Sequence, residues 1–263
     1  MRTALTIAGS DSGGGAGIQA DLKAFAAAGV HGATVITCVT AQNTIGVRSI
    51  YALPPREVRA QLDAVLSDIP VHAAKTGMLY SADIVKAVAA ALPPNRFPLV
   101  VDPVMVATVG ANLRRRDFRD ALIDRLLPEA TLVTPNLYEA SELAGFPVGS
   151  VLAMRRAAVA IADLGPKAVL VKGGHLNAEV VDVLYDGRFH EFRSSRFRKE
   201  LHGSGCVLAS SITAYLALRR PLRLAVIAAR RRVRAGFRTS YRVGGGVGVI
   251  NAGGTASRGG PQT

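Results

Sequence analysis

Four loops of the sequence hold the residue types that could do chemistry. The first is the glycine-rich segment 9–17 (GSDSGGGAG), which lies between an apolar run and a helical pattern. The second holds Asp102, the third holds Asn136 and Glu139, and the fourth is segment 203–206 (GSGC) at the start of a helical pattern. Ligands of open α/β sheets bind beyond the carboxyl ends of the strands, so these loops form the candidate site.

The fourth loop predicts an anion hole. Gly203, Ser204, Gly205 and Cys206 would place main-chain N–H groups at a helix start, where such groups attract anions. That arrangement suits the negative charge on a phosphoryl group in transfer. A cysteine at this position would have a pKa below its ordinary value. A tight turn around a small buried cysteine is the alternative, and the residues alone leave both open.

The first loop fits neither common nucleotide-binding motif. Residues 15–20 match the loose dinucleotide pattern Gly-x-Gly-x-x-Ala, and the glycines would let a ligand approach the backbone. That motif also needs an acidic residue about 20 positions later, at the end of the second strand. The strand runs into 40–43 (TAQN), and the next acid is Glu57. The chain has no Gly-Lys dipeptide and therefore no P-loop. A purely structural turn, with no ligand, is the alternative interpretation of this loop.

The polar residues after the other strands each allow two interpretations. Asp102 could hold Mg²⁺ or orient a nucleophile, and it could equally open a turn before Pro103. Asn136 and Glu139 have the spacing of a helix capping box, which accounts for both without a metal. Lys172 could contact phosphate or nucleotide, or could end its strand in solvent.

The elements that must position these loops alternate along the chain. Repeated strand–helix units need long crossovers, so they predict a mainly parallel sheet covered by helices on both faces. We expect strands at 3–8, 33–40, 47–52, 72–76, 98–101, 131–134, 168–171, 180–185 and 189–192. We expect helices at 18–28, 55–67, 82–92, 115–127, 137–144, 151–164, 206–218 and 222–237. The prediction is one α/β domain over 1–243 and a flexible Gly-rich tail over 244–263.

Composition excludes several other classes of protein. Hydrophobic residues make up 49% and charged residues 19% of the 263 residues, which excludes a disordered chain. No apolar run approaches the ~18 residues that a membrane helix needs, and the start does not resemble a secretory signal. Cys38 and Cys206, the only cysteines, cannot form a disulfide framework or a four-thiolate zinc site. We expect a cytoplasmic protein without a membrane partner, with Cys38 in the core.

The net charge of +13 invites the idea of a nucleic-acid partner. However, ten arginines and no acidic residue lie in 201–263, so the first 200 residues hold 22 basic and 19 acidic residues, a net +3. No aromatic residues interleave with these arginines, and no nucleic-acid recognition motif is present. A solvated arginine-rich helix is favoured over a polyanion-binding surface or a subunit contact.

In chain order, these motifs resemble the hydroxymethylpyrimidine and phosphomethylpyrimidine kinases of thiamine synthesis, in the ribokinase-like superfamily. The resemblance covers roughly residues 3–218. It rests on the segments 5–23 (LTIAGSDSGGGAGIQADLK), 41–44 (AQNT), 75–79 (KTGML), 101–105 (VDPVM), 134–137 (TPNL), 172–175 (KGGH) and 202–206 (HGSGC). It implies a three-layer sandwich in which a mainly parallel central sheet has helices on both faces.

The resemblance also implies transfer of the ATP γ-phosphate, with Mg²⁺, to 4-amino-5-hydroxymethyl-2-methylpyrimidine and to its monophosphate. The residues that would line the pyrimidine pocket are Gly9, Ala16, Gln42, Met78, Val106 and Cys206. The Gln42 amide offers both a donor and an acceptor, which suits an aminopyrimidine edge. Asn136, Glu139 and Asp102 would act on Mg²⁺ through water and phosphate. Lys172 would lie near the nucleotide.

In such a site Gly203–Cys206 would form the anion hole, with Cys206 where many sugar-kinase relatives carry an aspartate base. A Cys206 thiolate could serve as that base, or positioning and electrostatics could supply most of the rate. Relatives of this kind are commonly homodimers, and segment 47–52 could lie at such an interface.

Three segments depart from the pattern of the family. Residues 108–111 (TVGA) replace the usual Lys-Ser-Gly-Asp, and Glu200-Leu201 replaces Asn-Thr. Residues 244–252 lack the usual two histidines and the proline. These losses cluster on the phosphate side, so a pyrimidine-binding protein with weakened catalysis stays open. A pyridoxal kinase on the same scaffold is the nearest alternative, because pyridoxal also carries a hydroxymethyl group on a heteroaromatic ring.

Overall fold

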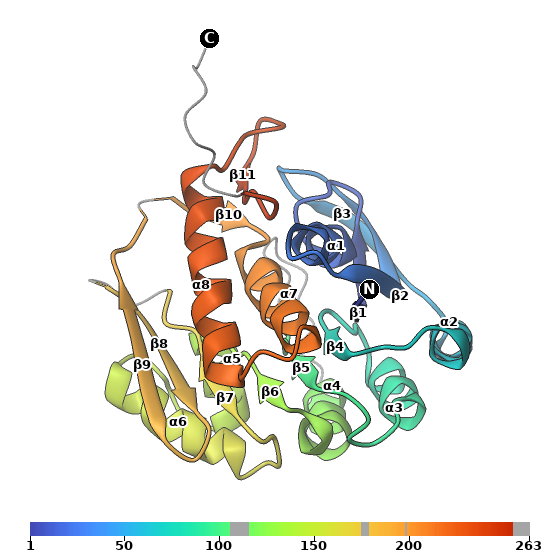
Figure 1. The fold of residues 1–263 in the computed structure, drawn as a ribbon, viewed down its shortest axis with the longest axis horizontal. Helices are drawn as coiled ribbons and strands as arrows, with labels where there is room; N and C mark the ends of the chain where they lie inside the picture. Colours follow the sequence, from blue (N-terminus) through green and yellow to red (C-terminus); the bar gives the residue numbers. More distant parts are fainter. Residues whose placement is uncertain (106–115, 175–178, 198, 255–263) are drawn as a thin grey trace.

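A nine-stranded sheet forms the centre of the molecule (Figure 1), with strand order β3-β2-β1-β4-β5-β6-β7-β8-β9. The structure, a computed structural model, describes residues 1–105, 116–174, 179–197 and 199–254. The strands are β1 (Thr3–Asp11), β2 (His31–Gln42), β3 (Val47–Ala52), β4 (Ala73–Thr76), β5 (Leu99–Val101), β6 (Leu132–Val133), β7 (Val169–Val171), β8 (Val180–Tyr185) and β9 (Phe189–Ser194). Strands β1, β2 and β4 to β7 pair in parallel, whereas β3, β8 and β9 pair antiparallel.

Helices cover both faces of this sheet, as predicted. One face carries α1 (Gly17–Ala27), α7 (Ser204–Ala217) and α8 (Leu222–Arg238). The other carries α2 (Pro55–Asp68), α3 (Ala82–Ala91), α4 (Arg116–Ala121), α5 (Leu137–Ala144) and α6 (Val151–Ala162). The helix expected at 115–127 instead continues from α4 through a π-helical turn, Leu122–Leu126, into a 3-10 turn, Leu127–Glu129. Pro128 in that turn cannot continue an α-helix.

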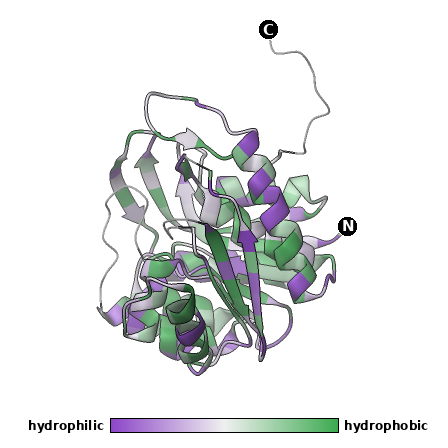
Figure 2. Cartoon of the chain, turned by 90° about the vertical axis from the view of Figure 1, so that its left-hand side faces the viewer, coloured by the Kyte–Doolittle hydropathy of each residue, from purple (hydrophilic) through white to green (hydrophobic). Residues whose placement is uncertain are grey.

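Alternating side chains divide the core between the two faces. Val100 packs on the side of α7 and α8, whereas its neighbours Leu99 and Val101 pack on the side of α3 and α4. Because parallel strands are buried on both faces, they read as continuous apolar runs. Figure 2, seen from the edge of the sheet that holds β8 and β9, shows both hydrophobic and hydrophilic residues on the helices around the sheet.

The arginines of α8 are partly structural. Arg230 Nε donates to Asp182 Oδ2 (2.7 Å), and its Nη2 donates to the Phe192 carbonyl (2.8 Å). Arg232 Nη2 donates to the Ala27 carbonyl at the end of α1 (3.0 Å). The expectation of a solvated helix is therefore wrong for these two arginines, which anchor α8 to its neighbours.

The glycine-rich C-terminal segment also differs from expectation. Strand β11 (Gly248–Val249) pairs with β10 (Leu201–His202), and Ile250 is buried. Val247 N donates to the Thr44 carbonyl (2.9 Å) after β2. The prediction of a flexible tail from residue 244 is therefore wrong as far as residue 254, because main-chain hydrogen bonds hold a segment that has few core-forming side chains. Residues 255–263 lie outside the described part.

Two predictions from composition can be compared with the fold. Within the described residues, no helix combines the length and the apolar character needed to cross a membrane. Cys38 and Cys206 are both free thiols. Cys38 is fully buried in β2, as expected for a core residue, and burial raises the pKa of its thiol to about 11.

Candidate active site

The first and fourth loops lie against each other. Gly203 precedes α7 with a left-handed φ of 86°, and a Cβ at this position would collide with the carbonyl oxygen of Gly15. A Cβ on Gly205 would lie 3.6 Å from Lys172 Nζ and 4.0 Å from Asp102 Oδ2. The structure therefore brings the glycine-rich loop, the start of α7 and the ends of β5 and β7 together.

The start of α7 has the features of an anion hole. Within the described part of the chain, no side chain caps this helix end, which leaves the first-turn N–H groups at Ser204 and Gly205 without a side-chain cap there. The glycines at 203 and 205 keep side-chain atoms away from these donors. The N-terminal charge of the helix dipole adds to their attraction for an anion.

Cys206 does not have the acidic thiol that the sequence predicts. Burial raises the pKa of the Cys206 thiol to about 11, although the Lys75 ammonium and the Gly17 N–H act in the opposite direction. The prediction of a lowered pKa is wrong because loss of water outweighs the helix start and the nearby cation. At neutral pH the residue is a thiol, which favours positioning over proton abstraction by a thiolate.

Asp102 is held in a buried network at the ends of three neighbouring strands. Lys172, which follows β7, places its Nζ 2.8 Å from Asp102 Oδ1, and Thr134 Oγ1, after β6, donates to the same oxygen (3.1 Å). Burial alone would raise the pKa of Asp102, but the ammonium groups of Lys172 and Lys75 bring it below its ordinary value. Asp102 is therefore an ionised acceptor beside Gly205.

Asn136 and Glu139 form the predicted capping box. Asn136 N donates to Glu139 Oε2 (2.8 Å), and Glu139 N donates to Asn136 Oδ1 (2.9 Å). Capping does not account for the burial of Glu139, which is 4% exposed. That burial raises the pKa of Glu139 to about 7, against the influence of the Lys172 ammonium. A carboxyl group poised near neutrality is characteristic of functional sites.

The donors near Lys172 suit one kind of metal binding. Among the described residues, no group of three or more His, Cys, Asp or Glu side chains could enclose a metal ion. Asp102 and Glu139 offer two carboxylates, and Mg²⁺ is commonly bound by one or two carboxylates together with water and substrate phosphates. The donor set therefore fits a Mg²⁺ ion that arrives with a nucleotide.

The residues expected on the pyrimidine side fall into two groups. Gly9 packs between Cys38 and Met78, since a Cβ on it would lie 2.7 Å from the Cys38 sulfur and 2.8 Å from Met78 Cε. Ala16 and Gln42 are joined through Asp11 and His202, as described below. Val106 lies outside the described residues, as do 108–111.

Sequence reasoning gave no role to a buried ion pair close to this site. Lys75 on β4 and Asp21 on α1 are both fully buried, with Nζ 2.9 Å from Asp21 Oδ2. Thr6 Oγ1 donates to the same carboxylate oxygen (2.7 Å). The Lys75 ammonium acts electrostatically on Cys206 and Asp102. The motif KTGML contains Lys75, but only the fold shows that its ammonium is under the site.

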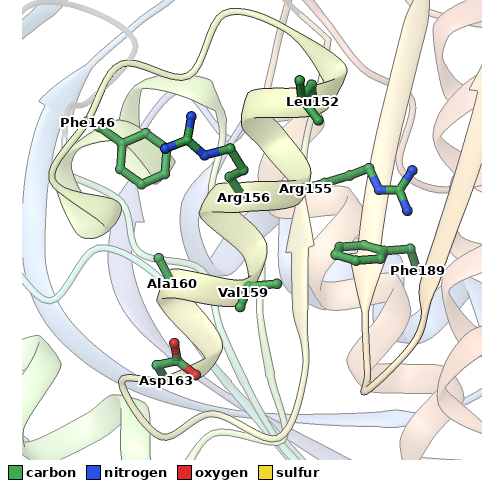
Figure 3. A pocket seen from close by; sticks show the side chains of 8 residues that line it. All are labelled: Phe146, Leu152, Arg155, Arg156, Val159, Ala160, Asp163 and Phe189. Atoms are coloured by element: carbon green, nitrogen blue, oxygen red, sulfur yellow. The ribbon is translucent and has the colours of Figure 1, made fainter.

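A surface hollow of about 520 Å³ lies elsewhere on the molecule (Figure 3). Arg155 and Arg156 stand on either side of it and stack on Phe189 and Phe146, at 4.3 and 5.2 Å from the ring centroids. The residues that line the hollow are Phe146, Leu152, Arg155, Arg156, Val159, Ala160, Asp163 and Phe189. None of them belongs to the four loops, so this hollow is not the candidate active site.

Comparisons with known proteins agree with this geometry. The model of the phosphomethylpyrimidine kinase family matches residues 11–251. The chain is 51% identical to the thiamine biosynthesis bifunctional protein ThiED of Geobacter sulfurreducens, over 94% of this chain and 51% of that protein. It is 49% identical to the hydroxymethylpyrimidine/phosphomethylpyrimidine kinase of Synechococcus elongatus, over 94% of this chain and 95% of that one.

A solved structure with the same fold is the pyridoxal kinase from Staphylococcus aureus in complex with AMP-PCP and pyridoxal. It has a TM-score of 0.90 and 35% identity, and the match covers 98% of this chain and 96% of that one. The fold and the site therefore define an α/β protein of the small-molecule kinase type. The predicted ribokinase-like architecture is confirmed.

The chain belongs to the phosphomethylpyrimidine kinase family. The resemblance predicted from the sequence motifs is thereby confirmed. The chain spans about half the length of ThiED but nearly the whole length of the Synechococcus elongatus enzyme. The family match therefore refers to one part of the bifunctional protein.

Proposed function

We propose that the chain transfers the γ-phosphoryl group of ATP to 4-amino-5-hydroxymethyl-2-methylpyrimidine and to its monophosphate. The observation that carries the proposal is the contact between the uncapped start of α7 and the glycine-rich loop, which contains Gly9 and holds Gln42 through Ser12. The identity of 49% to a kinase named for these two substrates supports the same assignment.

The chain's own residues supply positioning and charge in this reaction. The N–H groups of 203–206 would hold the phosphoryl group in transfer, and the Lys172 ammonium would contact nucleotide phosphate. Gly9, Ala16, Gln42 and Met78 would surround the pyrimidine. The Cys206 thiol would position the accepting hydroxymethyl group. Most of the acceleration would then come from orientation and electrostatic stabilisation.

Mg²⁺ would be held near Glu139, Asn136 and Asp102 through water and phosphate oxygens. When bound, the ion would neutralise negative charge on the phosphates during transfer. The two buried carboxylates and the adjacent Lys172 leave the pocket with one net negative charge when both acids are ionised, which is compatible with a divalent cation.

Two of the three departures from the family pattern, Glu200-Leu201 and residues 244–252, lie in the described part of the chain, whereas 108–111 lies outside it. Glu200 is exposed, and Leu201 packs in one cluster with Ile250 and Ala252 of the other altered segment. The two altered segments therefore compensate each other by packing. This observation favours an active kinase over a binding protein with weakened catalysis.

Coupled measurement of ADP release tests the function directly. With the pyrimidine, its monophosphate and pyridoxal offered separately, we expect kcat/KM to be highest for the two pyrimidines. The 35% identity to a pyridoxal kinase is the reason to include pyridoxal. No pyrimidine turnover by protein that unfolds cooperatively would contradict the proposal, and a preference for pyridoxal would replace it.

Replacement of Glu139 by glutamine should raise the Mg²⁺ concentration needed for half-maximal activity at least tenfold. Glutamine keeps the capping box but removes the carboxylate charge, so the helix should stay intact. Glu142→Gln on the same helix is the matched control and should leave the Mg²⁺ dependence unchanged. Activity titrated with Mg²⁺ at fixed ATP measures both. An unchanged requirement in the Glu139 variant would exclude Glu139 from the metal site.

We also propose that the protein is a cytoplasmic homodimer. The shortage of cysteines and the free state of both support a reducing compartment. Strand β3 is an edge of the sheet, and Tyr51 on it and Val39 on β2 are large hydrophobic residues with 69% and 45% exposure. A second copy pairing over this face would cover them.

A further inference from the structure

His202 stands between the two glycine-rich loops. Its Nε2 lies 2.9 Å from Asp11 Oδ2 and 2.9 Å from the amide nitrogen position of Gln42. The side chain is 10% exposed. A Cβ on Gly15 would come within 2.5 Å of the ring, so this loop position is glycine because the imidazole occupies the space. The ring therefore has a fixed place in the fold.

Asp11 is an ionised acceptor in this arrangement. It accepts from the N–H groups of Gly13 (2.8 Å), Gly15 (3.0 Å) and Ala16 (2.8 Å). Burial raises the pKa of Asp11, but the His202 hydrogen bond and these main-chain donors bring it below its ordinary value. An ionised carboxylate only accepts, so the His202 nitrogen that faces it carries a proton.

This proton decides which way the Gln42 amide points. With the amide nitrogen toward His202, two N–H donors would face each other at 2.9 Å. With the amide oxygen toward His202, the single Nε2–H of His202 is shared between Asp11 Oδ2 and the Gln42 amide oxygen. The amide nitrogen then takes the position 3.2 Å from Thr40 Oγ1, whose own proton goes to the Ser10 carbonyl (3.0 Å). Amide orientation is assigned by such networks, and only this orientation avoids two donors facing each other between His202 and Gln42.

The main chain of Gln42 is fixed as well. Ser12 Oγ donates to the Gln42 carbonyl (2.7 Å) and accepts from the Gln42 N–H (2.8 Å). Residues 11 and 12 of the first loop therefore hold this one residue by its backbone and, through His202, by its side chain. A residue held at both ends presents its donor and its acceptor to a ligand in one fixed order.

We propose that His202, oriented by Asp11, is a positioning residue that fixes the direction of the Gln42 amide and thereby selects an aminopyrimidine over pyridoxal. This inference rests on the proposed function. The polar neighbour of the hydroxymethyl group is an amino donor on the pyrimidine and an aldehyde acceptor on pyridoxal. An amide that cannot rotate can complement only one of these two groups. When pyridoxal binds in place of the pyrimidine, a buried polar group is left without a hydrogen-bond partner, and kcat/KM for pyridoxal is therefore lower.

Two substitutions at this position separate the hydrogen bond from packing. In His202→Gln the amide nitrogen can reach the position of Nε2 and donate to the same partners, whereas His202→Leu removes the donor. We expect His202→Leu to lower the ratio of kcat/KM for the pyrimidine over pyridoxal by about 10-fold to 100-fold. His202→Gln should keep the ratio within about threefold of wild type. If His202 had a purely structural role, His202→Leu would lower kcat/KM equally for the pyrimidine and for pyridoxal, and the ratio would not change.

A second variant keeps the inference testable if His202→Leu does not fold. Thr40→Val is nearly isosteric and frees the other end of the Gln42 amide, so it should shift the same ratio in the same direction. His190→Leu is the control and should leave the ratio unchanged, because His190 lies on the edge strand β9, with its Nε2 3.3 Å from Asp186 Oδ1. Urea unfolding checks that each variant is folded. The KM for ATP should stay constant while the KM for the pyrimidine rises.

Calorimetric titration of each acceptor without nucleotide separates failure of this inference from failure of the proposed function. If wild type binds the pyrimidine without phosphorylating it, the proposed function is overturned. The inference about His202 is then tested by the ratio of the Kd values for pyridoxal and the pyrimidine in wild type and variants. If wild type phosphorylates the pyrimidine and both His202→Leu and Thr40→Val keep its selectivity, only the inference is overturned. If wild type neither binds nor phosphorylates the pyrimidine, both are overturned.

Discussion

Replacement of Lys75 by methionine should lower the free energy of unfolding by about 3–5 kcal/mol, because it leaves the Asp21 carboxylate buried without its cation. Both side chains are fully buried, and the ammonium is 2.9 and 3.2 Å from the two carboxylate oxygens. Burial alone would lower the pKa of Lys75, but the neighbouring acidic groups, with Asp21 the strongest of them, together raise it above its ordinary value. Urea denaturation at pH 7 measures the change.

The pair should behave differently when both charges are removed. In the double variant Lys75→Met/Asp21→Asn no charge is left unpaired, so the loss should be well below the sum of the two single losses. Lys86→Met is the control, because Lys86 is 59% exposed and its nearest acid oxygen is 3.6 Å away. That variant should stay within about 0.5 kcal/mol of wild type. Additive losses in the double variant would show that the two residues act independently.

The secondary structure was predicted best where periodicity and turn residues agree. The segments Val47–Ala52, Leu137–Ala144 and Val180–Tyr185 have the predicted bounds. The two-residue strands β10 and β11 were missed, because two residues carry no periodicity and their pairing depends on residues far apart in the chain. The same reason explains why residues 244–254 were wrongly predicted to be flexible. This segment is rich in glycine and has few side chains for a core, so nothing in the sequence indicated its pairing with β10.

The candidate site shows a similar division. Spacing alone predicted the capping box of Asn136 and Glu139, but burial of Glu139 is a property of the surrounding fold. The position of Cys206 at a helix start predicts a lowered thiol pKa, whereas burial in the fold raises that pKa. His202 lies next to the anion hole in sequence, yet its contacts with Asp11 and Gln42 span 191 and 160 positions. Local sequence carries little information about such long-range contacts.

Replacement of Gly203 by alanine should lower kcat by about 10²–10³-fold, the usual effect of losing one main-chain donor to a developing negative charge. Gly203 has a φ of 86°, which disfavours side chains, and a Cβ on it would collide with the Gly15 carbonyl. The start of α7 must therefore move away from the first loop. Steady-state ADP release with saturating pyrimidine and ATP measures kcat.

The comparison that isolates this effect is Gly149→Ala, because a Cβ on Gly149 meets nothing within 4 Å. That variant should keep wild-type kcat. The Gly203 variant should also lose stability, so its urea midpoint must be measured and kcat determined where it is fully folded. If the folded variant kept kcat within about threefold of wild type, the N–H groups at the start of α7 could not be the donors that hold the phosphoryl group in transfer. The phosphate side of the mechanism would then have to rest on Lys172 and the metal alone.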